Sequence, residues 1–215
     1  MNTNMNRRRF SVTLLCAAAG AALVPNGPAF AQAAPVEGKD FTRVETPQQP
    51  SIAAGKVEVL EFFSYACPHC SAFEPTIEAW EKQLPAEVVF RRVPVAFLMN
   101  ADNFMRTYYA LETIGAVAAM QLKIFRAIHI ERKHLEKGED IATFVGANGG
   151  DAAKFLAAFK SFSVNTSVAR AKKLMADYKV DSVPTLVVQG RWITSPSLAG
   201  SQERSLAVVV WTMKR

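Results

Sequence analysis

Two cysteines separated by two residues are the feature of this sequence with the clearest chemistry. Cys67 and Cys70 enclose Pro68 and His69, and they follow directly on an apolar, β-branched run at 57–63. Apolar residues at helical spacing after the pair predict that a helix begins here, which places Cys67 where free N–H groups and the helix dipole stabilise a thiolate. Proline is tolerated in a first turn because its missing N–H has no partner there. The pair therefore predicts thiol–disulfide exchange.

The two cysteines have different expected roles. Cys67 is the exposed nucleophile, and His69 adds a hydrogen-bond donor beside it, with a positive charge when protonated. Cys70 lies one helical turn further on and is less exposed, so it can attack a mixed disulfide formed at Cys67 and resolve it.

Three other interpretations of the pair compete with this one. A zinc site needs about four ligands, but His129 and His134 lie far away in a helical stretch, so we expect no metal. A structural disulfide across so short a loop would restrain little of the chain. Chance spacing is the third. A strand followed by Cys-x-x-Cys at a helix start favours redox chemistry over these three.

An acidic side chain lies inside the expected buried strand. Glu61 shares a face with apolar residues of the run at 57–63, six residues before Cys67. A buried carboxylate must be paired, or else protonated with a raised pKa. On the next strand, alternation turns either Arg91 or Arg92 inward. We interpret Glu61 as a functional acid that relays protons near the cysteines; a structural ion pair is the alternative.

Residues 1–31 are predicted to be a cleaved signal peptide. Three arginines at 7–9 precede an apolar run at 10–24, and small residues follow it at alternate positions. This is the order of a secretory signal, and the run is shorter than the roughly 20 residues that a membrane-spanning helix needs. Cleavage after Ala31 is the first choice, with Ala33 and Ala34 as alternatives. The arginines fit both general and twin-arginine export.

Removing that segment changes the charge and the cysteine count of the 215-residue chain. The formal charge falls from +6 to +3, because the segment carries three arginines and no acidic residue. So small a charge does not indicate nucleic-acid binding. Cys16 leaves with the segment, so Cys67 and Cys70 remain as a pair in an oxidising compartment. The hydrophobic content of 50% suffices for a folded core.

The strand pattern of the remaining chain indicates an α/β fold. Strands are expected at 41–44, 57–63, 88–93, 185–188 and 192–193. The second and third flank a helix that Pro75 should kink, so they form a parallel βαβ unit. The last two form a hairpin with a tight turn at Gly190. Pro184 belongs at a strand start because it cannot donate to a ladder; a cis bond and a plain loop junction both fit.

Helical periodicity dominates from Leu98 to about Arg170. Asp102 and Asp151 are expected to cap helices within this stretch, and Ser201 is expected to cap a last helix that runs to the C-terminus.

Three parts of the sequence together closely resemble the DsbA family of exported bacterial thiol:disulfide oxidoreductases. They are residues 60–70 (Leu-Glu-Phe-Phe-Ser-Tyr-Ala-Cys-Pro-His-Cys), the helical stretch after Phe97 and the tripeptide Val183-Pro184-Thr185. The resemblance implies a thioredoxin fold, a mixed central sheet flanked by helices, interrupted by an all-helical insertion domain. We accordingly divide the mature chain into a first thioredoxin part (32–97), the insertion (98–170) and a second thioredoxin part (171–215).

The resemblance also implies a mechanism and partners. Cys67 would be the nucleophile and Cys70 its buried partner, with Pro184 cis and packed against their disulfide. Val183, Pro184 and Thr185 would border a groove for extended polypeptide. No cofactor beyond the disulfide is expected. The implied partners are reduced or unfolded exported proteins and a membrane quinone-linked oxidase of the DsbB kind, for a monomer in the periplasm.

One departure from the family affects Glu61. The family's buried acid usually pairs with a lysine on the next strand, and aligning Val95-Ala96-Phe97 puts Arg92 at that position. Arginine stays charged where lysine could shift its pKa, which favours an ionised Glu61 and weakens the proton relay. Val183 before the proline, by contrast, matches the family and disfavours metal binding there.

Two other functions share these features. A disulfide isomerase or reductase would use Cys67 and Cys70 but need a dimerisation segment, for which 32–56 is too short. A chaperone-like binder of unfolded exported chains would not need Cys67 at all.

Overall fold

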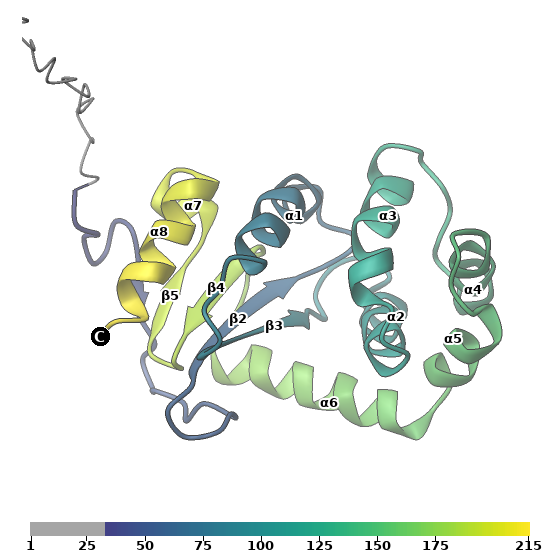
Figure 1. The fold of residues 1–215 in the computed structure, drawn as a ribbon, viewed down its shortest axis with the longest axis horizontal. Helices are drawn as coiled ribbons and strands as arrows, with labels where there is room; N and C mark the ends of the chain where they lie inside the picture. Colours follow the sequence, from purple (N-terminus) through teal and green to yellow (C-terminus); the bar gives the residue numbers. More distant parts are fainter. Residues whose placement is uncertain (1–32) are drawn as a thin grey trace, which may run out of the picture. The chain divides into compact units, whose positions relative to one another are not determined.

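A five-stranded mixed sheet forms the centre of residues 33–215, the part of the chain that the computed structural model describes (Figure 1). Its order is β1-β5-β4-β2-β3, with β2 and β3 parallel and the other pairs antiparallel. The strands are β1 (Thr42–Arg43), β2 (Val57–Phe63), β3 (Val88–Pro94), β4 (Thr185–Val188) and β5 (Trp192–Thr194). All the expected strands are confirmed, although β1 is shorter than expected. The predicted signal peptide, 1–31, lies outside the described residues.

Helices cover both faces of the sheet and extend beyond it. In Figure 1, α1, α7 and α8 lie on one face, and α6 runs along the other. Helix α2 packs against β3, and α3 packs against α1. No helix among the described residues is long and apolar enough to cross a membrane. The helices are α1 (Pro68–Glu81), α2 (Ala101–Thr113), α3 (Val117–His129), α4 (Gly138–Ala147), α5 (Ala152–Phe159), α6 (Phe162–Asp177), α7 (Pro196–Ala199) and α8 (Gln202–Thr212).

Strand β2 is buried on both faces, as its nearly continuous apolar sequence predicts. Val59 on one face joins a core with α1 and α8, which consists of Val59, Phe73, Ile77, Leu186, Val188, Leu206 and Val209. Leu60 and Phe62 on the other face belong to a larger core that continues into the helical insertion. The ring of Phe62 packs edge-on against Tyr178, at the end of α6, with centroids 5.8 Å apart. Both cores therefore fix the position of the strand that leads into the cysteine pair.

Two of the three expected helix caps are confirmed. Asp151 accepts a hydrogen bond from the N–H of Lys154 at 2.9 Å, and Ser201 caps α8 in the same way. The expected cap at Asp102 is wrong, because the N-cap of α2 lies two residues earlier, at Asn100, which has a left-handed conformation (φ 54°). Asn tolerates this region better than most residues do. Asp102 instead pairs with Arg106, one turn along, at 2.7 Å.

Two expectations concern residues that lie inside helices, the kink at Pro75 and the domain boundary at Arg170. Helix α1 continues past Pro75, which is exposed, so the proline does not end it; the kink stays a prediction. Arg170, where we end the insertion domain, lies within the single helix α6. That helix joins the insertion to the second thioredoxin part without a break.

The β4–β5 turn generates a prediction about stability. Gly190 has φ +64°, and a Cβ there would lie 2.1 Å from the backbone oxygen of Gln48, whose N–H donates to the Gly190 oxygen at 3.0 Å. Gly190→Ala therefore combines left-handed strain with a backbone clash. We expect it to lower the free energy of unfolding by more than about 2 kcal/mol in urea denaturation.

Gly149→Ala is the matched control for that substitution. Gly149 also has a positive φ (+90°), but nothing lies within 4 Å of its Cβ position. It should cost only the strain of about 1 kcal/mol. Equal losses in the two variants would show that the contact with Gln48 contributes nothing.

Candidate active site

Cys67 is the N-cap of α1, as the sequence predicts. Its backbone is extended (φ −89°, ψ 116°), and its Sγ accepts a hydrogen bond from the N–H of Cys70 at 3.2 Å. Pro68 occupies the first turn, where its missing N–H costs nothing. Because the first N–H groups of a helix lack partners within it, the Cys67 sulfur takes a position that favours negative charge.

The two sulfurs differ strongly in acidity. Hydrogen bonding from the Cys70 thiol, helped by the N–H groups of Cys70 and His69 and by the charge of His69, lowers the pKa of Cys67 to about 6. Burial opposes this shift but does not cancel it. Burial raises the pKa of Cys70 far above the ordinary thiol range, and the neighbouring Cys67 adds to the increase. A single negative charge on the pair therefore resides on Cys67.

The expectation of an exposed Cys67 is wrong for the structure described, in which both cysteines are free thiols. Cys67 is 4% exposed and Cys70 1%. Cys70 is therefore the less exposed of the two, as expected, but both are buried. The reason is a loop from the far end of the chain: the Val183 carbonyl oxygen lies 3.5 Å from the Cys67 Sγ and accepts its S–H. Pro68 and His69, between the cysteines, are exposed.

The loop that covers Cys67 is the predicted proline segment. The Val183–Pro184 peptide bond is cis, as expected. Val183 is half-buried, whereas Pro184 and Thr185 are buried, and the Thr185 hydroxyl donates to the Ser182 carbonyl at 2.8 Å. The fold thus brings Val183 beside a cysteine 116 residues earlier in the chain.

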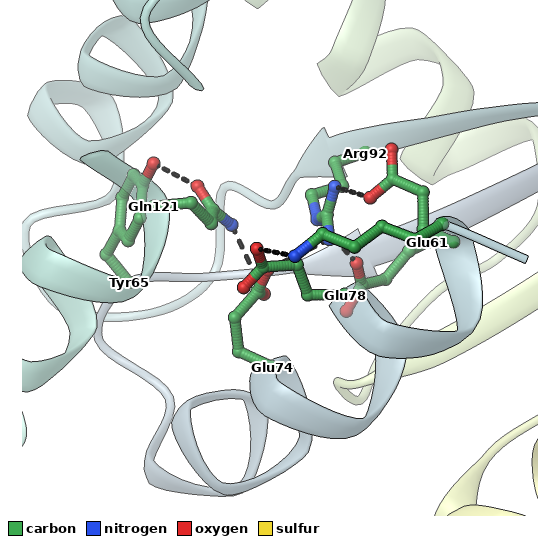
Figure 2. A network of polar contacts seen from close by, with 8 residues as sticks. Glu61, Tyr65, Glu74, Glu78, Arg92 and Gln121 are labelled. Atoms are coloured by element: carbon green, nitrogen blue, oxygen red, sulfur yellow. Dashed lines mark hydrogen bonds and ion pairs between the residues drawn. The ribbon is translucent and has the colours of Figure 1, made fainter. Parts of the chain in front are cut away.

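Arg92 is the inward-facing arginine. It lies opposite Glu61 in the β2–β3 register, with Nε 3.1 Å from Glu61 Oε2. Its other nitrogens reach two carboxylates of α1, Glu74 at 2.9 Å and Glu81 at 2.8 Å. Figure 2 shows Arg92 between Glu61 and the residues of α1. Arg91 pairs instead with Glu58. The choice that the sequence left open is thereby settled in favour of Arg92.

Glu61 is not held ionised by Arg92, contrary to our expectation. One guanidinium faces three carboxylates, and Glu61 is fully buried, with neither oxygen in a hydrogen bond among the described residues. Burial raises the pKa of Glu61 to about 8; Arg92 lowers it, while Glu74 and Glu81 raise it further. Sharing the arginine among three acids leaves too little attraction to offset desolvation. At neutral pH Glu61 therefore holds a proton.

Polar contacts extend from this cluster to the turn before Cys67. Gln121 of α3 donates to Glu74 at 3.3 Å, and the Tyr65 hydroxyl donates to Gln121 at 2.5 Å (Figure 2). When charged, the Glu61 carboxylate is close enough to Cys70 to raise the pKa of that thiol. The acidic cluster therefore borders the cysteine pair.

Three residues of this site, Glu74, Gln121 and His129, were not predicted from the sequence as functional. Glu74 carries a usable signal, because it follows Cys70 by four residues and shares its helix face. Gln121 and His129 carry none, since only the packing of α3 brings them here. His129 lies far from the cysteines in sequence but not in space: its Nε2 is 2.8 Å from the Tyr65 carbonyl oxygen.

The comparisons with known proteins agree with this geometry. A family model described as thioredoxin matches residues 52–204. The thiol:disulfide interchange protein DsbA of Burkholderia cepacia is 41% identical over 209 residues, 97% of each chain. The Pseudomonas aeruginosa DsbA (strain PAO1) is 38% identical over 180 residues, 83% of this chain and 84% of the relative.

Solved structures show the same likeness. The crystal structure of Pseudomonas aeruginosa DsbA has a TM-score of 0.80 at 37% identity and covers 84% of this chain and 93% of that one. The crystal structure of reduced DsbA1 from Neisseria meningitidis has a TM-score of 0.73 at 26% identity and covers 84% of this chain and 94% of that one.

Sheet order, the cysteine pair at the start of α1 and the inserted helices define a thioredoxin-fold protein with a helical insertion. Within that class, the chain belongs to the DsbA family of thiol:disulfide interchange proteins.

The buried acid predicts a particular pH dependence of stability. The pKa of Glu61 is about 8 in the folded protein against an ordinary 4.5, so between these values the folded state holds a proton that the unfolded state has lost. Stability therefore falls as pH rises through this window, by up to about 1.4 kcal/mol per pH unit. Glu61→Gln removes the titration, so we expect the variant to gain on the parent as pH rises.

Urea denaturation at several pH values measures this difference. Glu87→Gln, at an exposed glutamate just before β3, is the control and should leave the pH dependence unchanged. Parallel stability curves for Glu61→Gln and the parent would contradict the protonated state of Glu61.

Proposed function

We propose that Cys67 and Cys70 form the disulfide that this protein donates to reduced, newly exported proteins, and that Cys67 is the sulfur they attack. The protein is a protein thiol:disulfide oxidoreductase of the DsbA type. The difference in acidity between the two thiols supports these roles most strongly, because the sulfur with the lower pKa, Cys67, is the better leaving group in the second step, which releases the oxidised substrate.

The reaction begins from the oxidised pair. A substrate thiolate attacks Cys67, the Cys67–Cys70 bond breaks, and Cys70 leaves as a thiolate. A second substrate thiolate then attacks the substrate sulfur of the mixed disulfide and displaces Cys67. The substrate loses two electrons and gains a disulfide, while the enzyme ends as a dithiol. The stabilised Cys67 thiolate speeds the second step and makes the enzyme disulfide oxidising.

Glu61 supplies the proton that the first step requires. Cys70 leaves into a buried site in which its pKa is strongly raised, so it takes up a proton at once. Glu61 is protonated at neutral pH and near enough to Cys70 for its charge to act on that thiol, and Arg92 is in place to pair with the carboxylate that remains. The proton returns when the disulfide is remade. Arginine in place of the family's usual lysine is compatible with this role, because the acid and not its partner carries the proton.

Substrate lies against the proline loop. The Val183 carbonyl, which accepts the Cys67 S–H in the dithiol, is a main-chain group that an extended polypeptide can contact without regard to its sequence. Pro184 and Thr185 hold this segment at the start of β4. Main-chain contacts suit an enzyme with many different substrates.

The cellular setting follows from the N-terminal sequence and the family. We place the mature protein in the periplasm as a monomer, after removal of the signal peptide 1–31. A membrane quinone-linked oxidase of the DsbB kind would reoxidise the dithiol. No cofactor beyond the disulfide takes part in the exchange.

Redox titration against glutathione tests the oxidase assignment. We expect the Cys67–Cys70 pair to be more oxidising than glutathione, because the dithiol form is stabilised by the Cys67 thiolate. A strongly reducing midpoint would overturn the assignment in favour of a reductase.

Two cysteine variants test the roles within the pair. Cys67→Ser should lose all transfer of disulfides to a reduced substrate protein, whereas a chaperone-like binder would keep its activity. Cys70→Ser is the matched variant: Cys67 still attacks a substrate disulfide, but nothing resolves the product, so a mixed disulfide should accumulate. Accumulation in Cys67→Ser instead would reverse the two roles.

A further inference from the structure

Helix α3 of the insertion contacts one residue of the active-site turn at three points. Gln121, Phe125 and His129 are spaced by four residues, which puts them along one side of the helix. All three reach Tyr65: Gln121 through the hydroxyl at 2.5 Å, Phe125 through its ring at a centroid distance of 5.1 Å, and His129 through the backbone carbonyl at 2.8 Å. Of these contacts, only that of His129 acts on the main chain of the turn.

The contact fixes where one proton lies. A carbonyl oxygen can only accept a hydrogen bond, so Nε2 of His129 carries the hydrogen and donates it to Tyr65. The imidazole ring stacks on Phe125, with centroids 6.1 Å apart and planes 29° apart, which sets its orientation. The donor is therefore held in place by its own helix.

The turn that His129 holds determines the position of Cys67. Within it, the Cys67 N–H donates to the Ser64 carbonyl at 3.0 Å, and the Ala66 N–H donates to the Ser64 hydroxyl at 3.1 Å. The Tyr65 carbonyl lies between these bonds. A shift of this peptide would move the Cys67 Sγ relative to the Cys70 N–H, the donor that lies 3.2 Å away.

We propose that His129 is a positioning residue for disulfide exchange, acting through its hydrogen bond to the Tyr65 carbonyl. The inference rests on the proposed function, because it assigns a role at the same site. The dithiol form depends on this bond more than the disulfide form does. In the disulfide a covalent bond holds the two sulfurs together, whereas in the dithiol only hydrogen bonds align Cys67 with its donors. Loss of the bond therefore makes the disulfide less oxidising.

Two substitutions separate the hydrogen bond from the packing of the ring. His129→Phe keeps a flat ring beside Phe125 but removes the donor, whereas His129→Gln keeps an N–H donor at similar reach. His134→Phe is the control, since His134 lies shortly after the end of α3 and its side chain is 91% exposed. The readout is the equilibrium constant of the cysteine pair with glutathione, measured with the thermal stability of each form.

We expect His129→Phe to shift that equilibrium constant about fivefold towards a less oxidising disulfide, the ratio that corresponds to one ordinary hydrogen bond. For His129→Gln, the equilibrium constant should stay within about twofold of the parent value, a change that corresponds to less than the free energy of one ordinary hydrogen bond. For His134→Phe it should equal the parent value. If His129→Phe does not fold, His129→Leu replaces it in the same comparison with His129→Gln.

An unchanged equilibrium constant in the folded donor-less variant would overturn the proposal, as would equal shifts in His129→Phe and His129→Gln. These outcomes differ from failure of the proposed function, in which the parent protein itself would not exchange disulfides through Cys67.

Discussion

The unequal stability of negative charge on two neighbouring sulfurs is the constraint on which the rest of this structure depends. Cys67 and Cys70 are both buried, and burial alone would raise the pKa of both thiols. The start of α1 makes the two sulfurs unequal, because the Cys67 sulfur accepts hydrogen bonds from the thiol and the N–H of Cys70, and these lower the pKa of Cys67 against the effect of burial. Strand β2 and the turn after it deliver Cys67 to that position, and the Val183 carbonyl covers it.

The acidic cluster of Glu61, Glu74, Glu81 and Arg92 affects the charge near the other sulfur, that of Cys70. A second full negative charge beside Cys70 would make the opening of the disulfide costly. Arg92 offsets the charges of Glu74 and Glu81, and Glu61 holds a proton at neutral pH. Charge is thus kept low near the buried sulfur, while a proton remains available to it. Helix α3 links the cluster to the active-site turn through Gln121 and Tyr65 (Figure 2).

Local signals made part of this predictable from sequence. The apolar run of β2, a proline after Cys67 and apolar residues at helical spacing specify strand, turn and helix within a few residues of one another. What depended on distant parts of the chain was predicted less well. Cys67 is covered by a loop 116 residues away, and His129 reaches Tyr65 across 64. The ionisation of Glu61 was misjudged because two acids of α1 share its arginine, which pairwise reasoning between β2 and β3 does not include.

Titration of the Cys67 thiolate in the dithiol protein tests the central claim most directly. Thiolates absorb ultraviolet light that thiols do not, so absorbance against pH follows the charge on the pair, and Cys70→Ser assigns the transition to Cys67. The structure predicts a midpoint at about pH 6 for Cys67, with Cys70 remaining protonated well into the alkaline range. A Cys67 midpoint at the ordinary thiol value of about 8.5 would contradict the account.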